Sequence, residues 1–466
     1  MFYRLFICTV LSAFYLAACS LAPDYAQPDL PVPTELTAND NINLDSAGLA
    51  AQDLYGAPVK EFFKDERLQA LIAISLEHNK DLKLAALSVL EAKSQYRVQK
   101  AEQLPEVSVS GSDDYRGGFG KPRTNDYEIA GMAFFELDLF GRISSMNEAA
   151  LQNYLATEEA ARAVRISLVA EVARAYLAER LAYERLQLTG SNLQSWKNSF
   201  AFIERRLESG QSSWLDLEQA RSMVEFALAD LAERERELIR AGNALSLLLG
   251  HYGPKAVYDA LPEPTKLEDQ RLLQLPDGIA SGVLLKRPDV LQAEHMLMAE
   301  NANIGAARAA FFPSISLTGN LGYMSDDLGL LVRDANSFWS LLPQISLPIF
   351  SGGRNKANLD IAELRKEMSI ARYEKTIQIA FNEVADTLLS RGTFTRQYTA
   401  QQRYLQTQRQ VLKLALASYA SGIVSYLEVL AAERGVFEAE QNLLGIRQAQ
   451  LNNDITLYAA LGGGLN

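Results

Sequence analysis

The sequence is poor in the residues that enzyme chemistry and metal binding most often use. It has two cysteines and three histidines among 466 residues. His78, His251 and His295 lie far apart, with no carboxylate or cysteine grouped near them at metal-ligand spacing. There is neither a phosphate-binding loop nor a Gly-x-Ser-x-Gly nucleophile motif. We therefore expect a protein that is not an enzyme and that has no metal site and no cofactor.

The chain also lacks an excess of basic residues. Its 57 acidic residues outnumber its 45 lysines and arginines, which gives a net charge of −12 at pH 7. Binding to phosphate backbones requires a basic surface, so nucleic acid is not an expected partner. Proline and glycine are modest in number, and the rest of the composition favours long helices over a compact α/β enzyme.

Long apolar runs are absent except at the N-terminus. Arg4 precedes the apolar run 5–16 and then Leu16-Ala17-Ala18-Cys19, which has the short core and small-residue cleavage site of a secretory signal. The order Leu-Ala-Ala-Cys resembles the bacterial lipobox, in which cleavage leaves Cys19 as a lipid-modified N-terminus. A plain signal peptide with an incidental cysteine is the alternative.

Residues 1–18 are accordingly predicted to be a signal peptide, and residues 19–60 a polar, proline-bearing leash behind the lipid on Cys19. Ser20 resembles the residue found in lipoproteins of the outer membrane. One cysteine in the mature chain cannot form an intramolecular disulfide. No other apolar run reaches about 18 residues, so any further membrane crossing must be made by strands.

What the chain does contain is an internal duplication. Glu171-Val172-Ala173 recurs as Glu383-Val384-Ala385, and Ser209-Gly210 recurs as Ser421-Gly422, each 212 positions later. This period is far too long for a solenoid and indicates two copies of one supersecondary unit. We place the copies at 61–249 and 288–461, joined by a linker at 250–287 and followed by a short tail at 462–466.

Each repeat is predicted to contain the same elements in the same order. A helix, whose periodicity begins near Asp65 in the first repeat, stops at a proline and is followed by two strands, a very long helix and a return helix. The predicted ranges are 105–139, 142–208 and 212–249 in the first repeat, and 313–348, 354–420 and 424–461 in the second. Each long helix would span about 100 Å, so it is built to cross a distance.

The strands leave two interpretations open. In the first repeat, a stretch rich in Gly, Asp, Lys and Asn is expected to form a turn, and the second strand is expected from Tyr127 to Asp138. Alternation between 127 and 138 suits a membrane barrel with lipid outside and water inside, and it suits a soluble sandwich nearly as well. Four strands cannot close a transmembrane barrel, because the smallest have about eight. If these strands lie in a membrane, other chains must therefore complete the sheet.

Ordered motifs along nearly the whole mature chain resemble those of the outer-membrane factors of the TolC/OprM type, and most closely the OprM-like lipoprotein branch. These motifs are Ser20-Leu21-Ala22-Pro23-Asp24-Tyr25, Lys286-Arg287-Pro288-Asp289-Val290, the stretch 303–313, Pro348-Ile349-Phe350 with Gly352-Gly353-Arg354, and Leu461-Gly462-Gly463-Gly464.

The resemblance implies an α+β membrane protein of the Gram-negative outer membrane that extends into the periplasm. It implies a homotrimer with a twelve-stranded β-barrel, four strands per chain, continued by a long α-helical coiled barrel with a mixed equatorial region. Such a trimer is a passive exit duct for drugs or other small amphiphilic compounds. It works with a periplasmic adaptor and an inner-membrane transporter, usually of the resistance-nodulation-division class. The alternatives are a duct for type I protein secretion and a structural trimeric coiled-coil lipoprotein.

The resemblance also implies docking residues for the adaptor at the tips of the two helical hairpins. Arg206, Leu207 and Gly210 match the family's Arg-Leu-x-x-Gly pattern in the first repeat, and Gly422 retains the glycine in the second. The glycines have a structural explanation as well, because a chain that reverses often needs a positive φ.

A periplasmic gate is expected just past these tips, formed by Leu427, Glu428, Asp216 and Tyr419. Family members narrow the tunnel there with apolar and acidic rings, to which Leu427 and Glu428 correspond, although a charge on a long helix is normally solvated. Two departures weaken the match: Ala431 stands at the next acidic position, and Val424 stands where an arginine would pair with Asp216. Tyr419 is the retained candidate for a contact that locks the tip.

Overall fold

The structure is a computed structural model that describes residues 21–33, 35–37, 58–119, 121–250, 261–273 and 278–463. The predicted signal peptide and Cys19 lie outside these residues. The described residues fall into two compact units, one within the ranges 1–29, 87–159 and 289–376, the other within 30–86, 160–288 and 377–466. The long helices contribute residues to both units.

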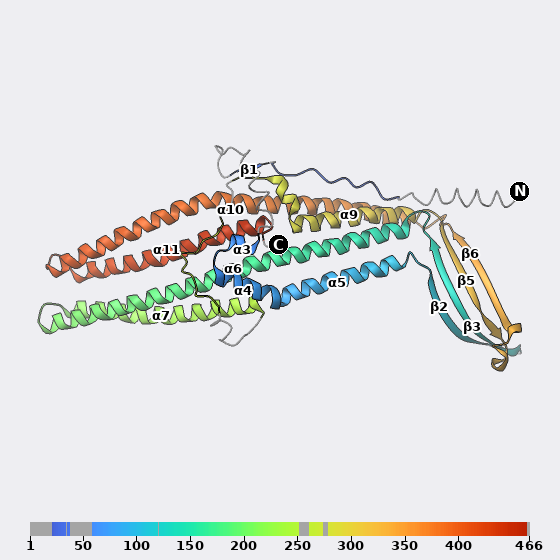
Figure 1. Ribbon diagram of the computed structural model, residues 1–466, viewed down its shortest axis with the longest axis horizontal. Coiled ribbons are helices and arrows are strands. Elements are labelled where there is room, and N and C mark those ends of the chain that lie inside the picture. The colour runs from blue at the N-terminus through green and yellow to red at the C-terminus, as the bar shows by residue number, and fades with distance from the viewer. Residues whose placement is uncertain are drawn as a thin grey trace. The chain divides into compact units, whose positions relative to one another are not determined.

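The first unit contains a four-stranded antiparallel sheet in the order β2-β3-β5-β6 (Figure 1). The strands are β2 (Glu106–Gly118), β3 (Lys121–Leu137), β5 (Ser314–Ser325) and β6 (Ser337–Ser346). Two short 3-10 helices, η2 (Leu328–Leu330) and η3 (Asp334–Asn336), join β5 to β6. Each repeat supplies one hairpin, and β3 pairs with β5 where the two hairpins meet. Strands β2 and β6 are the two edges of the sheet.

The first hairpin is longer than the sequence suggested. The stretch before Tyr127, rich in Gly, Asp, Lys and Asn, was expected to form a broad turn, but β2 runs to Gly118 and β3 begins at Lys121. Asp113 pairs with Tyr127 and Asp114 with Asp126 within the ladder. Cross-strand pairing therefore overrides the turn preference of these residues, as is common in sheets.

The predicted single helix from Asp65 to Leu104 is wrong, because the structure has two helices there. These are α4 (Glu66–His78) and α5 (Lys80–Ala101), separated at Asn79. The side-chain oxygen of Asn79 accepts hydrogen bonds from the backbone N–H groups of Asp81 and Leu82, at 2.9 and 3.0 Å. Asn79 thus caps the start of α5 and makes the break stable. The second repeat has one helix at this place, α9 (Pro288–Ala309).

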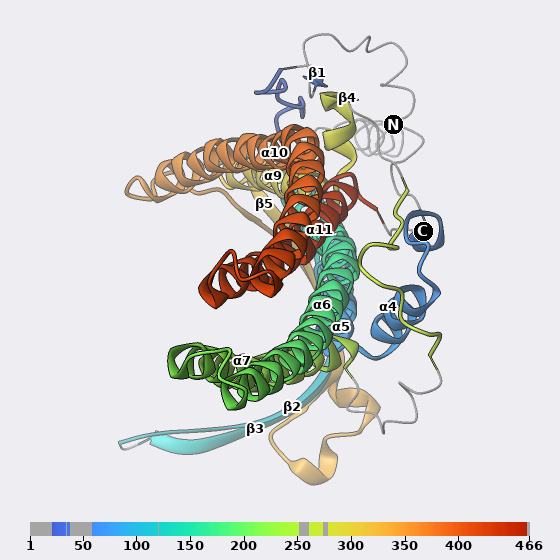
Figure 2. The same cartoon turned by 90° about the vertical axis from the view of Figure 1, so that its left-hand side faces the viewer.

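Four helices dominate the second unit: the tip-proximal parts of α6 (Arg142–Glu208) and α10 (Arg354–Ala420), with the return helices α7 (Trp214–Leu249) and α11 (Tyr426–Ala460). The bounds of α6 and α10 coincide with the predicted ranges. Figures 1 and 2 both show the order α10, α11, α6, α7. No helix in the described part of the chain combines the length and the apolar character needed to cross a membrane.

The linker between the repeats is fastened to the second unit by side chains from several helices. The carboxylate of Glu184 accepts a hydrogen bond from the Leu267 N–H at 2.8 Å. The guanidinium of Arg447 donates to the carbonyls of Leu267 and Gln270 at 3.1 and 2.8 Å. The same unit holds the two-stranded sheet β1 (Glu35–Thr37) with β4 (Gly278–Ala280), the 3-10 helix η1 (Ser281–Lys286) and α3 (Val59–Phe62).

Candidate functional site at the helical tips

The chain reverses direction at the two tips by the same backbone device. Gly210 and Gly422 both have φ of +72°, a conformation that residues with a Cβ avoid. After α6, the N–H of Gly210 donates to the carbonyl of Leu207, and the next N–H donates to the carbonyl of Arg206. After α10, Gly422 and Ile423 make the equivalent bonds. Both turns are Schellman motifs, so a structural requirement accounts for both glycines.

Just before the first turn, the side chain of Arg206 in the first hairpin contacts the second hairpin. The guanidinium carbon of Arg206 lies 4.9 Å from the centre of the Tyr419 ring, within the range of a cation–π contact. Arg206 also donates to the carbonyl of Gln211 at 3.3 Å. Leu207 packs, partly buried, on the apolar core behind the tips. The structure therefore brings Arg206 and Tyr419 together, although the sequence assigned them to docking and to the gate respectively.

The Asp216 side chain takes part in the N-terminal cap of its own helix, α7. Ser213 is the N-cap of α7, and its hydroxyl accepts from the Asp216 N–H at 3.1 Å, while the Asp216 carboxylate accepts from the Ser213 N–H at 3.1 Å. The hydroxyl of Ser212 adds a third hydrogen bond at 3.0 Å. This is a complete capping box. Among the residues that the structure describes, no hydrogen bond links Asp216 to Tyr419.

The second repeat has the same Ser-x-x-acid pattern and does not use it in this way. Ser425 is the N-cap of α11, but its side chain makes no capping hydrogen bond. Glu428, three residues later, is exposed, and Leu427 beside it is 56% exposed. Ala431 is also exposed, and Val424 is half-buried. In the isolated chain, the Glu428 carboxylate is therefore not committed to helix capping, whereas that of Asp216 is.

A polar cluster lies behind the tips, and sequence reasoning did not identify it. Ser199 of α6 donates to the carboxylate of Glu433 of α11 at 3.3 Å. The rings of Tyr419 and Tyr426 are 5.5 Å apart. Burial raises the pKa of Glu433, although hydrogen bonds from Ser199 and Trp196 lower it in part. In the sequence, this cluster is marked by one signal, the charged residue Glu433 among the apolar residues of α11.

An apolar core surrounds this cluster and joins the two hairpins. The buried residues come from α6, α7 and α11 and are Leu193, Trp196, Ile203, Leu217, Ala220, Met223, Ala227, Tyr426, Val429, Leu430 and Phe437. Trp196 contacts Phe437 edge to face, with ring centres 5.5 Å apart. Because this core is continuous between repeats, the tips of one chain form a single packed body.

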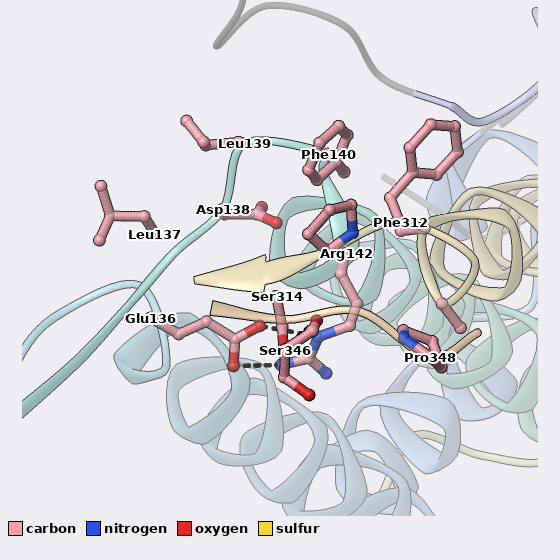
Figure 3. A pocket seen from close by; sticks show the side chains of 13 residues that line it. Glu136, Leu137, Asp138, Leu139, Phe140, Arg142, Phe312, Ser314, Ser346 and Pro348 are labelled. Atoms are coloured by element: carbon pink, nitrogen blue, oxygen red, sulfur yellow. Dashed lines mark hydrogen bonds and ion pairs between the residues drawn. The ribbon is translucent and has the colours of Figure 1, made fainter. Parts of the chain in front are cut away.

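The first unit has a cavity of about 380 Å³ where the strands meet the helices (Figure 3). Arg142, the first residue of α6, forms two hydrogen bonds with the carboxylate of Glu136 on β3, at 3.1 and 2.9 Å. Asp138 accepts from the N–H groups of Ile143 and Ser144 at 3.1 and 2.7 Å, and so caps α6. The rings of Phe140 and Phe312 stack at 4.8 Å. These contacts fix the direction in which α6 leaves β3.

Neither the helical tips nor the cavity at the strand ends has, among its described residues, the ligand atoms of a metal centre. Within the described ranges, no three His, Cys, Asp or Glu side chains gather closely enough to hold a metal ion. The cavity at the strand ends is lined by the Glu136–Arg142 ion pair, by Asp138 and two serines, and by apolar side chains. The tips present two glycine turns, one cation–π contact and the exposed Glu428.

Comparison with known proteins agrees with this geometry. The family described as outer membrane efflux protein matches residues 71–251 and 279–463. The chain is 46% identical over 456 residues to the cation efflux system protein CusC of Escherichia coli K12, covering 97% of this chain and 98% of that protein. It is 42% identical to the probable outer membrane lipoprotein SilC of Salmonella typhimurium, covering 99% of each chain.

A third relative and a solved structure extend the match. The toluene efflux pump outer membrane protein TtgI of Pseudomonas putida is 43% identical over 460 residues, covering 96% of each chain. A crystal structure of CusC superposes with a TM-score of 0.87 at 45% identity, covering 96% of this chain and 100% of that one. The predicted combination of four strands per chain with long helices is confirmed. The chain belongs to the outer membrane efflux protein family and is the outer-membrane channel component of an efflux system.

Proposed function

We propose that three copies of this chain form a passive exit duct, and the observation that carries the proposal is the open sheet. Strand β2 has 13 residues and β6 has 10, and each is paired on one side only within the chain. Unpaired backbone groups in a bilayer cost several kcal/mol each. Joining β6 of one copy to β2 of the next would remove both edges and give a closed barrel of twelve strands.

Exposed apolar side chains on the strands support a membrane location for the sheet. Val109 on β2 is 78% exposed and Trp339 on β6 is 77% exposed. Large apolar groups at such exposure are favourable in contact with lipid or with a neighbouring copy, and unfavourable in water.

We further propose that Cys19 carries a covalent lipid that anchors the chain in the outer membrane. The leash that follows is held against α9: Arg308 donates to the carbonyl of Leu21 at 3.3 Å and Asn301 to that of Pro23 at 2.7 Å. The Tyr25 hydroxyl donates to Glu294 at 3.1 Å. These contacts would keep the lipidated N-terminus near the end of α9. The description of SilC as a probable outer membrane lipoprotein supports the same proposal.

The tips are proposed to serve as gate and as docking surface. Three copies of Glu428 around an axis would repel one another and attract cations, with Leu427 forming an apolar ring beside them. Arg206, Leu207, Gly210 and Gly422 would present the turns to a periplasmic adaptor, which links the duct to an inner-membrane transporter of the resistance-nodulation-division class. The exposure of Glu428 and the identical turns of the two repeats support these roles.

The proposed cargo is small, namely drugs or other amphiphilic compounds that the transporter selects. The relatives are named for different cargo, cations for CusC and toluene for TtgI. A duct that serves such different systems would let chemically different small compounds pass. Deleting the gene in a strain that lacks paralogues tests this, with two panels, one of metal salts and one of organic compounds. Increased sensitivity to several organic compounds is expected, and sensitivity to the metal salts alone would restrict the cargo to cations.

A bilayer experiment tests the duct itself. The full mature chain, purified in detergent, should have the mass of a trimer and should conduct ions in planar bilayers. The Cys19→Ser variant should conduct equally while losing its lipid by mass spectrometry. A protein that remains monomeric, or a trimer that never conducts, would refute the proposal.

A further inference from the structure

The tip half of α10 has an unusual charge. No acidic residue occurs between Asp386 and Glu428, whereas the same stretch contains five basic ones: Arg391, Arg396, Arg403, Arg409 and Lys413. The corresponding part of the first repeat mixes both signs. In a chain with a net charge of −12, this is a concentrated positive surface on one helix.

Three of the five cations have no partner within the described part of the chain. Arg409 pairs with Glu440 at 2.7 Å and Arg391 with Asp454 at 3.6 Å. Arg396, Arg403 and Lys413 are exposed and form no ion pair with described residues. A hollow of about 490 Å³ on this surface is lined by α10 alone and is polar throughout; it comprises Arg403, Gln406, Thr407, Arg409 and Gln410. We call the surface formed by Arg396, Arg403 and Lys413 the α10 basic stripe.

The return helix α7 has the opposite charge over its tip half. From Trp214 to Glu235 it contains six acidic residues and two basic ones. Asp216 caps the helix, and Glu218 and Asp230 pair with arginines of α7 itself. Glu225, Glu233 and Glu235 are exposed and form no ion pair with described residues. Glu225 and Glu233 are eight residues apart, so they lie within about 80° of each other around the helix, whereas Glu235 points to nearly the opposite side from Glu233. We call Glu225 and Glu233 the α7 acidic stripe.

The two stripes lie at the same distance from the tips. Lys413, Arg403 and Arg396 precede Gly422 by nine, nineteen and twenty-six residues. Counted from Gly210, the residues of the α7 acidic stripe follow by fifteen and twenty-three. At ~1.5 Å per residue, both stripes fall within roughly 14–39 Å of the turn. The Arg206–Tyr419 contact shows that the two tips of a chain are level.

The stripes of one chain cannot meet each other. In the second unit α10 and α7 are the outermost helices, with α11 and α6 between them (Figures 1 and 2). Hydrogen bonds link α11 to α6 through Ser199 and Glu433, and α6 to α7 through Thr189 and Asp230. When chains are arranged in a ring, however, the outermost α10 of one copy faces the outermost α7 of the next.

We propose that the α10 basic stripe of each copy docks on the α7 acidic stripe of a second copy of this chain, and thereby closes the helical ring in the correct order. The inference rests on the trimer proposed above, and it identifies α10 of one copy and α7 of the next as the helices in contact. Such an interface is head-to-tail and closes only as a ring. Charged residues that flank a helical seam set the choice and register of the partner, as in coiled coils.

Disulfide crosslinking of the full trimeric protein tests the contact. In the double variant Arg403→Cys with Glu233→Cys, mild oxidation should link different copies and give dimer and trimer bands on a denaturing gel. The control is Arg403→Cys with Gln194→Cys, because Gln194 is exposed on α6 at a similar distance from the tip. We expect several-fold more interchain product from the first pair. Equal yields from both pairs, or none, would refute the contact.

Charge exchange provides a second test that needs no cysteine. Arg403→Glu and Glu233→Arg alone should each raise the dissociation constant of the trimer about fivefold at low ionic strength, and the double exchange should restore at least half of the loss. High salt should reduce all three effects. Unchanged dissociation in both single variants, or no recovery in the double variant, overturns the inference.

The mass and conductance of the unmodified protein separate this inference from the proposed function. If the protein forms a conducting trimer but neither crosslinks nor responds to charge exchange, only the α7–α10 contact is wrong. If the unmodified protein is monomeric, the trimer itself is wrong, and the contact with it.

Discussion

The guanidinium of Arg206 lies 4.9 Å from the ring of Tyr419, so the end of α6 touches the end of α10 within one chain. The contact joins the tips of the two hairpins and leaves the buried core behind them closed. Any separation of the hairpins at the tip must break it first.

Removing this contact should loosen the tip. Arg206→Ala is expected to lower the free energy of unfolding by about 0.5–1 kcal/mol, the usual contribution of a cation–π pair near the protein surface, and to raise the conductance of the resting duct. Arg205→Ala is the control, because among the described residues the Arg205 side chain donates to the carbonyl of Ala201 on its own helix and does not reach the second hairpin. Thermal unfolding and bilayer recordings provide the measurements, and equal behaviour of the two variants would argue against a role for the contact.

The two acidic residues at the tips should respond differently to neutralisation. Asp216→Asn weakens a complete capping box and should cost up to about 1 kcal/mol of stability, with little change in ion selectivity. Glu428→Gln removes a charge that makes no capping hydrogen bond and has only the weaker attraction of an acidic group to the start of its helix, so it should cost less stability than Asp216→Asn while preference for cations falls. Thermal unfolding and reversal potentials measure the two effects. A stability loss in Glu428→Gln as large as that in Asp216→Asn would show that Glu428 has an equal structural role.

Stability of the tips should depend on pH through Glu433. Burial raises the pKa of this carboxyl in the folded chain, so the folded state holds its proton at a pH where the unfolded state has released it. Stability therefore falls as pH rises from the ordinary glutamate value, about 4.3, through the raised pKa. Glu433→Gln should flatten this slope and stabilise the protein at neutral pH.

The control for this prediction is Glu438→Gln, since Glu438 is exposed on the same helix. Unfolding followed between about pH 4 and pH 8 checks the slope. The same slope in Glu433→Gln as in the unmodified chain would mean that other buried carboxyls, such as Asp454 and Glu184, produce it.

The turn glycines should tolerate no side chain. Gly210→Ala and Gly422→Ala each force a residue with a Cβ into φ of +72°, at a cost of about 1–2 kcal/mol. Gly190→Ala is a matched control inside α6, where a Cβ meets nothing within 4 Å and helix propensity should add up to about 1 kcal/mol. Thermal unfolding of the three variants tests this. Loss of adaptor binding in a glycine variant that keeps full stability would instead indicate direct docking.

The parts of the fold that follow from local pattern were predictable, and those that follow from pairing were not. The long helices have sustained apolar spacing without proline, and glycines mark their turns, so their bounds were found from the sequence. Strand β3 begins six residues earlier than expected, at Lys121, because β2 supplies partners for residues whose own preference is for turns. The break at Asn79 was missed because the apolar spacing continues across it while one side chain caps the next helix.

The tip residues show the same division. Motif matching located Gly210, Gly422, Asp216 and Glu428, but the sequence gives both Ser-x-x-acid patterns the same appearance, and only the structure separates the capping Asp216 from the uncapped Glu428. Glu433 belongs to no sequence motif, and its hydrogen-bond partner Ser199 lies in the other repeat, so the sequence alone could not identify this contact.

The unequal use of these two patterns has a consequence for how such ducts diversify. A residue that holds a helix end in place cannot change freely, because each replacement is paid in stability. The Glu428 side chain makes no capping hydrogen bond, so a change of its charge should disturb folding less than a change at Asp216. The duplicated scaffold thus places one tip carboxylate under a capping constraint that the other does not share, so the charge at the second tip can be changed with less effect on the helix that holds it.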